Sequence, residues 1–80
     1  MPRPPTLPEP WRSLCEVVER QWLAAHPGKQ SPGGLTMVAE ALHSNVSTVR
    51  RWAHEERSPN GPAQALIRAL FAAHHLESPV

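Results

Sequence analysis

Apolar residues recur every three or four positions in several stretches of this 80-residue chain, and this periodicity decides its fold class. In the first stretch, Trp11, Leu14 and Val18 fall on one side of a helix. No stretch alternates apolar and polar residues as a half-buried strand does. The pattern therefore predicts an all-α fold, a small bundle of about four helices.

Proline, glycine and asparagine mark where these helices begin and end. Proline suits the first turn of a helix, because its missing N–H has no partner there. Threonine and asparagine side chains cap helix N-termini. The expected helices are residues 10–25, a short helix that Thr36 caps and that ends near Leu42 or His43, residues 46–54 with Asn45 as N-cap, and residues 62–74.

The length of the chain permits a single domain, which we expect over residues 10–76. Residues 1–9 are rich in proline and predict an extended N-terminal arm rather than a signal peptide. Residues 26–34 read as a long loop, and residues 77–80 as a frayed tail. No apolar run is long enough to cross a bilayer, so we expect no transmembrane helix and no membrane partner. A single cysteine leaves no internal disulfide, which favours an intracellular protein, and we expect it in the cytoplasm.

Few residues offer catalytic or metal-binding chemistry. The single cysteine, Cys15, lies on the apolar side of the first helix, where a buried and inert thiol is expected. His74 and His75 are adjacent, so they face apart on a helix and do not form a metal clamp. No Ser/His/Asp arrangement, phosphate loop or pair of carboxylates is present. We therefore expect no enzyme, no cofactor and no metal.

The stretch from residue 35 to residue 52 predicts two short helices joined by a tight turn. Ala39 is small, which allows the second of these helices to cross close to the first. The expected core of the pair is Val38, Ala39, Leu42, Val49 and Trp52.

The other side of the expected helix 46–54 carries a group of polar residues. At about 100° per residue, Ser47, Arg50, Arg51 and His54 project away from the core side. Arginine pairs with guanine O6 and N7 in the major groove, or with phosphate. Val46, at the start of the helix, can touch a thymine methyl group. The alternative is a solvated charged face on which Arg51 pairs with Glu55.

Three runs resemble the Cro/repressor-like (XRE-type) helix-turn-helix family: V-A-E-A-L at residues 38–42, S-T-V-R-R-W at residues 47–52, and R-S-P with G-P-A at residues 57–63. His43 stands where the family usually has glycine at a positive φ, and Ser44 where it has a small apolar residue. The resemblance implies a lambda repressor-like DNA-binding domain, whose fourth helix and tail often form the dimer. The implied base contacts are Val46, Ser47, Arg50, Arg51 and His54, and the candidate phosphate contacts are Thr36, Asn45, Thr48 and Arg57.

We therefore expect a sequence-specific transcriptional regulator from a bacterium or a phage, which associates with the nucleoid of the bacterial cell. It would be a repressor or autorepressor that binds a palindromic operator as a homodimer, with half-sites about 34 Å apart. Two other functions stay open: an excisionase- or MerR-like architectural DNA binder, and a small phage protein-interaction module. Arg3 is a further candidate for a minor-groove contact. The candidate dimer residues are Leu70, Phe71 and Leu76, or Trp11 and Trp22.

Overall fold

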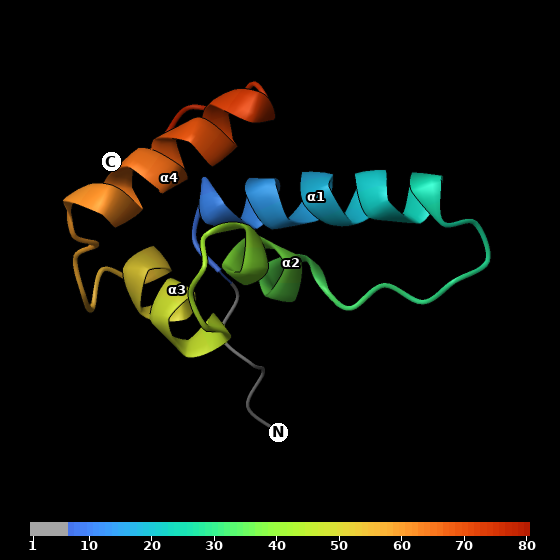
Figure 1. Cartoon of the computed structure of the whole chain (residues 1–80), viewed down its shortest axis with the longest axis horizontal. Helices are drawn as coiled ribbons and strands as arrows, with labels where there is room; N and C mark the ends of the chain where they lie inside the picture. Colours follow the sequence, from blue (N-terminus) through green and yellow to red (C-terminus); the bar gives the residue numbers. More distant parts are fainter. Residues whose placement is uncertain (1–6) are drawn as a thin grey trace.

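The computed structural model describes residues 7–80 and contains four helices, with no strand in that part of the chain (Figure 1). The helices are α1 (Trp11–Ala25), α2 (Gly34–Ala41), α3 (Val46–Ala53) and α4 (Gly61–Ala73). In Figure 1, α2 and α3 lie on one side of α1, and α4 lies on the other side, near the N-terminal end of α1. The predicted all-α class and the number of helices are confirmed.

All four helices contribute to one hydrophobic core. Trp11 of α1 meets Phe71 of α4 edge to face, with ring centroids 5.2 Å apart and an interplanar angle of 86°. Such aromatic pairs stabilise beyond the area that they bury. The buried residues are Trp11, Leu14, Cys15, Val38, Ala39, Leu42, Val49, Ala53, Ile67 and Phe71.

The core prediction was correct for all but one residue of the α2–α3 pair. Val38, Ala39, Leu42 and Val49 are buried. Trp52 is only half-buried and packs against the edge of the core. A small residue on the same helix, Ala53, is fully buried, so the prediction of Trp52 as a core residue is confirmed only in part.

Helix α2 begins earlier than predicted because it touches the backbone of α1. Its N-cap is Gly33, at φ 104°, so Thr36 lies inside the first turn and the prediction of a Thr36 cap was wrong. Gly34 is buried against α1, and a Cβ atom there would lie 2.3 Å from the carbonyl oxygen of Cys15. Only a glycine permits this contact between the two helices.

The last three helices end in the same way. After each one, a residue that is not glycine adopts a left-handed conformation, and the next amide bonds back to a carbonyl of the last turn, at 2.9 Å in every case. This is the Schellman motif, which usually uses glycine. The prediction of a positive φ at His43 is therefore confirmed. The three residues are His43 (φ 53°), Glu55 (φ 59°) and His75 (φ 57°).

Replacing any one of these three residues by glycine should stabilise the protein by about 0.5–1 kcal/mol, because glycine adopts a positive φ without steric cost. Urea unfolding followed by circular dichroism measures the change. His26→Gly is the control, since His26 ends α1 at φ −130° and its Nδ1 lies 2.9 Å from the carbonyl oxygen of Trp22. A gain of stability at His26, or a loss at His43, would contradict the account.

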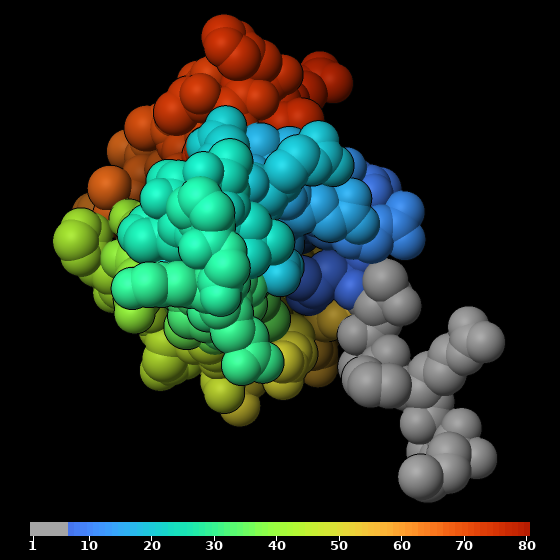
Figure 2. Space-filling view, turned by 90° about the vertical axis from the view of Figure 1, so that its right-hand side faces the viewer, coloured from blue at the N-terminus to red at the C-terminus, as the bar shows by residue number. Residues whose placement is uncertain are grey.

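The segments outside the helices are held to the domain. In residues 26–33, the Ser31 hydroxyl donates to Glu19 of α1 at 2.9 Å and accepts from the Gly33 amide at 3.1 Å. Figure 2 shows this segment, in blue-green, lying across one face of the molecule. The chain end lies beside α4 (Figure 1), where Arg68 Nε donates to the Val80 carbonyl at 3.2 Å. The predicted tail of residues 77–80 forms no regular structure, and this bond ties its last residue to α4.

The N-terminal arm is described only in part. Arg3 and the rest of residues 1–6 lie outside the described residues. Leu7 packs against the core, and the Arg12 amide donates to the Pro8 carbonyl at 3.1 Å as the chain turns into α1. Residues 7–9 thus belong to the domain and not to an extended arm.

Candidate nucleic-acid interface

The start of α3 is fixed by the turn that precedes it. The Asn45 side chain accepts a hydrogen bond from the Thr48 amide at 2.8 Å, which satisfies one of the free donors of the first turn. The predicted N-cap is confirmed. The cap uses only the side-chain oxygen of Asn45, which is exposed, so its amide Nδ2 keeps its donors for the predicted phosphate contact, and that contact stays a prediction.

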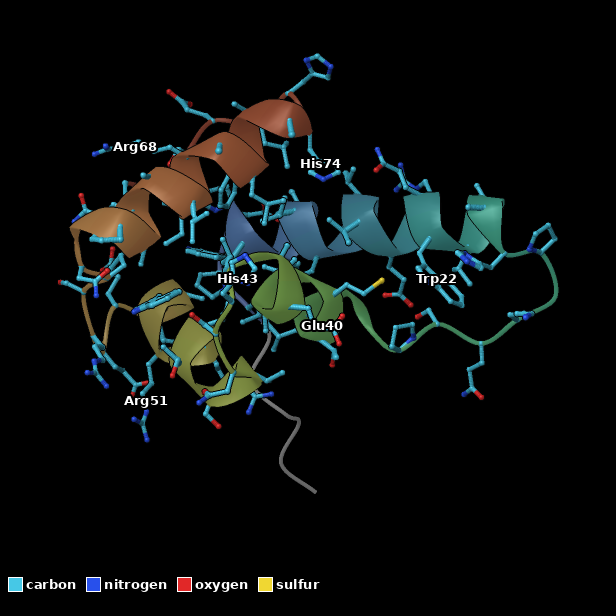
Figure 3. All side chains as sticks on the ribbon, viewed as in Figure 1. Trp22, Glu40, His43, Arg51, Arg68 and His74 are labelled. Atoms are coloured by element: carbon cyan, nitrogen blue, oxygen red, sulfur yellow. The ribbon has the colours of Figure 1, made fainter. Side chains whose placement is uncertain are left out.

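Helix α3 separates a buried side from a bare one. Val49 and Ala53 are buried, whereas Ser47, Arg50 and Arg51 are exposed. Figure 3 shows the Arg51 side chain extending away from the body of the protein. The amphipathic pattern read from the sequence therefore places three of the five candidate base contacts together on one open surface.

The arginines of α3 make no ion pair within residues 7–80, where the only such pair joins Arg12 Nε to Glu9 Oε1 at 2.9 Å. The alternative in which Arg51 pairs with Glu55 is thus wrong. The helix ends at Ala53 and Glu55 takes a left-handed conformation, so these two side chains no longer follow helical spacing. Both guanidinium groups are left available for an anionic partner.

Two of the predicted base contacts do not lie on the bare side. His54 is the C-cap of α3 and half-buried, and its Nε2 is buried with no hydrogen-bond partner among the described residues. Its prediction as an exposed contact was wrong, because the helix ends before it. Val46 is half-buried and packs against the core. Its remaining exposed surface is at the start of α3.

The predicted phosphate contacts are only partly brought together. Arg57 is exposed and lies beside α3, because it lines a small hollow with Thr48 and Trp52. Thr48 is half-buried, and its amide is taken by the Asn45 cap. Thr36 is half-buried in the first turn of α2. The group that the structure assembles on and beside α3 is therefore Ser47, Arg50, Arg51 and Arg57.

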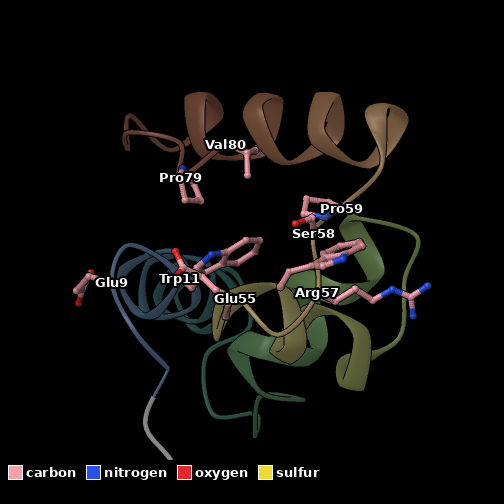
Figure 4. Close-up of a pocket in the computed structure, with 10 residues that line it drawn as sticks. Glu9, Trp11, Glu55, Arg57, Ser58, Pro59, Pro79 and Val80 are labelled. Atoms are coloured by element: carbon pink, nitrogen blue, oxygen red, sulfur yellow. The ribbon is translucent and has the colours of Figure 1, made fainter.

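A second hollow lies behind α3, with a volume of about 250 Å³ (Figure 4). Its walls come from the start of α1, the end of α3, the segment after α3 and the chain end. Two tryptophans, Trp11 and Trp52, and two charged residues, Glu55 and Arg57, are among the residues that line it. Sequence reasoning missed this hollow, because only the half-exposure of Trp52 and the return of the tail create it.

The structure offers little other chemistry in the part of the chain that it describes. Burial raises the pKa of the Cys15 thiol to about 11, and the carboxylates of Glu19 and Glu16 add to this effect. The thiol therefore stays protonated at neutral pH, as expected for an inert cysteine. Residues 7–80 contain no group of three or more histidine, cysteine or acidic side chains placed to hold a metal ion. No helix there is long and apolar enough to cross a membrane.

Comparison of the chain with family models, with curated proteins and with solved structures gives no match in any of the three.

Proposed function

We propose that this chain is a sequence-specific DNA-binding protein that places α3 in the major groove of double-stranded DNA. One observation carries the proposal: Arg50 and Arg51 project from the bare side of a helix whose opposite side is anchored in the core. The major groove is about 12 Å wide and admits an α-helix. A helix held by its buried side presents its arginines without having to move.

Each polar residue on and beside α3 has a distinct part in this proposal. Arg50 and Arg51 read guanine O6 and N7 or bind phosphate, since their planar guanidinium groups donate two parallel hydrogen bonds. Ser47, in the first turn of α3, donates to a base edge or to a phosphate. Arg57 lies to the side of the helix and binds the backbone, which sets the position of the protein on the duplex.

We further propose that the protein acts as a homodimer, because half-sites related by a two-fold axis match two copies of α3. Two of the candidate residues, Trp11 and Phe71, are buried and so unavailable. The outer side of α4 is the better surface, since it is exposed and carries no charge along one stripe. That stripe consists of Ala65, Leu66, Ala69, Ala72 and Ala73.

Placing a charge in this stripe should separate the dimer. We expect Ala69→Glu to weaken self-association at least tenfold, because two carboxylates would be buried opposite each other at a two-fold contact. Gln21→Glu, on the exposed side of α1, adds the same charge away from α4 and is the control. Sedimentation equilibrium measures both. A wild-type chain that stays monomeric at high concentration would remove the dimer from the proposal.

DNA binding through these arginines should weaken steeply as salt concentration rises. Three arginines in each copy displace about six counterions from a duplex, which predicts a slope of about −5 for log K against log salt. Raising salt from about 50 to 200 mM should then reduce affinity about a thousandfold. Fluorescence anisotropy of a labelled duplex measures this. DNA affinity that does not change with salt concentration, or no DNA binding at low salt, would instead favour the alternative function of a protein-interaction module.

Repression is the regulatory outcome that we propose, through occlusion of a promoter by the bound dimer. The architectural alternative of the excisionase or MerR kind is less favoured, because it normally needs a β-wing after the second helix of the motif. Within residues 7–80 no strand occurs, and the chain passes from residue 60 directly into α4. A repressor and an architectural DNA binder could both use the site on α3, so the lack of a β-wing in residues 7–80 is the feature that favours the repressor.

A further inference from the structure

The hollow behind α3 has features of a small-ligand site (Figure 4). Its volume of about 250 Å³ exceeds the roughly 150 Å³ of an apolar cavity that accepts benzene. It is smaller than the sites of drug-sized ligands, which start near 300 Å³. A single aromatic ring with a short arm is therefore the size that fits.

The apolar walls suit a flat ring. Trp11 and Trp52 both line the hollow, and Pro79 and Val80 lie across it from above in Figure 4. Trp52 is half-buried, so part of its indole ring is exposed to solvent. A ligand that covers this part of the ring would remove its apolar surface from water. Stacking on an indole is favourable for an aromatic ligand.

The charge around the hollow favours a cation. Glu55 lines it and makes no ion pair within residues 7–80. The C-terminal end of α3, which carries partial negative charge, lies there too. Indole faces attract cations as well. The opposing charge, Arg57, extends its guanidinium group away from the hollow in Figure 4.

We infer that this hollow binds a small organic cation made of one aromatic ring and an alkylammonium arm. The ring stacks on the exposed part of the Trp52 indole, and the ammonium group faces the carboxylate of Glu55. Binding of this ligand does not depend on DNA, because the walls and charges of the hollow are complete in the free protein. Its test is likewise made without DNA, so that its failure leaves the proposed function untouched.

The test compares three ligands of one shape: 2-phenylethylammonium, 2-phenylethanol and phenylacetate. The protein carries Trp22→Phe, which leaves Trp11 and Trp52 as its only tryptophans, so that fluorescence reports on the hollow alone. We expect saturable binding of the ammonium ligand with a dissociation constant of about 0.1–1 mM. Phenylacetate should bind at least tenfold more weakly than 2-phenylethylammonium, and the affinity of 2-phenylethanol should lie between the affinities of these two ligands.

Two matched variants locate the charge. Glu55→Gln should weaken the ammonium ligand about fivefold, because an exposed charge pair contributes modestly. Glu56→Gln removes the neighbouring exposed carboxylate, which does not line the hollow, and should change binding less than twofold. Equal binding of the cation and the anion, equal effects of the two variants, or no saturable binding of 2-phenylethylammonium would each overturn the inference.

Discussion

The double substitution Arg50→Ala and Arg51→Ala should weaken duplex binding about 100-fold or more at physiological salt. An arginine that reads a base contributes about 1–3 kcal/mol, and about 1.4 kcal/mol is a factor of ten in affinity. Both side chains are exposed and unpaired within the described residues, so their loss should leave the free energy of unfolding within about 0.5 kcal/mol of wild type. Loss of binding would then be due to lost contacts and not to unfolding.

The matched control is the double substitution Arg20→Ala and Lys29→Ala. It removes the same charge from exposed positions on α1 and in the segment that follows it. We expect this control to lose no more than about threefold in affinity, since distant charges act only through screened attraction. Anisotropy titrations of one duplex at one salt concentration compare the two. Equal losses would mean that total charge, and not the face of α3, holds the DNA.

Gly34→Ala should destabilise the protein by about 3 kcal/mol. The added Cβ would lie 2.3 Å from the carbonyl oxygen of Cys15 and 3.0 Å from its Cβ. The first of these atoms is backbone, so α1 and α2 must move apart, and the core between them is opened. Since small domains are stable by only about 5–15 kcal/mol, this change removes a large share of the total.

Gly61→Ala is the control for this prediction, because it makes the same chemical change where there is space. Gly61 is the first residue of α4 and has no atom within 4 Å of the position that a Cβ would take. We expect it to change the free energy of unfolding by less than about 1 kcal/mol, because the gain from a less flexible unfolded chain is offset by crowding of the new Cβ against Pro62. Urea unfolding measures both variants. A Gly34→Ala protein as stable as wild type would show that α1 and α2 do not touch at this point.

The sequence was sufficient where one local rule decides the structure. Apolar periodicity located the four helices to within a few residues, and Asn45 marked the start of α3. The expectation of a positive φ at His43 came from the family resemblance, because the family usually has glycine at that position. The bare side of α3 followed from the same periodicity, because Val49 fixes which side faces the core.

The remaining features depend on contacts between distant parts of the chain. Gly33 and Gly34 signalled a loop, whereas Gly34 is the first residue of α2 and touches Cys15 of α1. Trp52 fits the core side of α3 by spacing, but it is only half-buried and packs against the edge of the core, while Ala53 is fully buried. The return of Val80 to Arg68 closes a hollow that no local pattern encodes. The sequence therefore predicted helices and their faces, but not how closely they pack.

The most direct measurement of the central claim is an amide NMR titration of the labelled protein with a short duplex at about 50 mM salt, where contacts to phosphate need no particular operator. The account predicts that chemical-shift changes concentrate on Val46–Arg51 and on Arg57, with little change along the outer side of α4. Shift changes that spare α3, or that gather instead on α1, would contradict it.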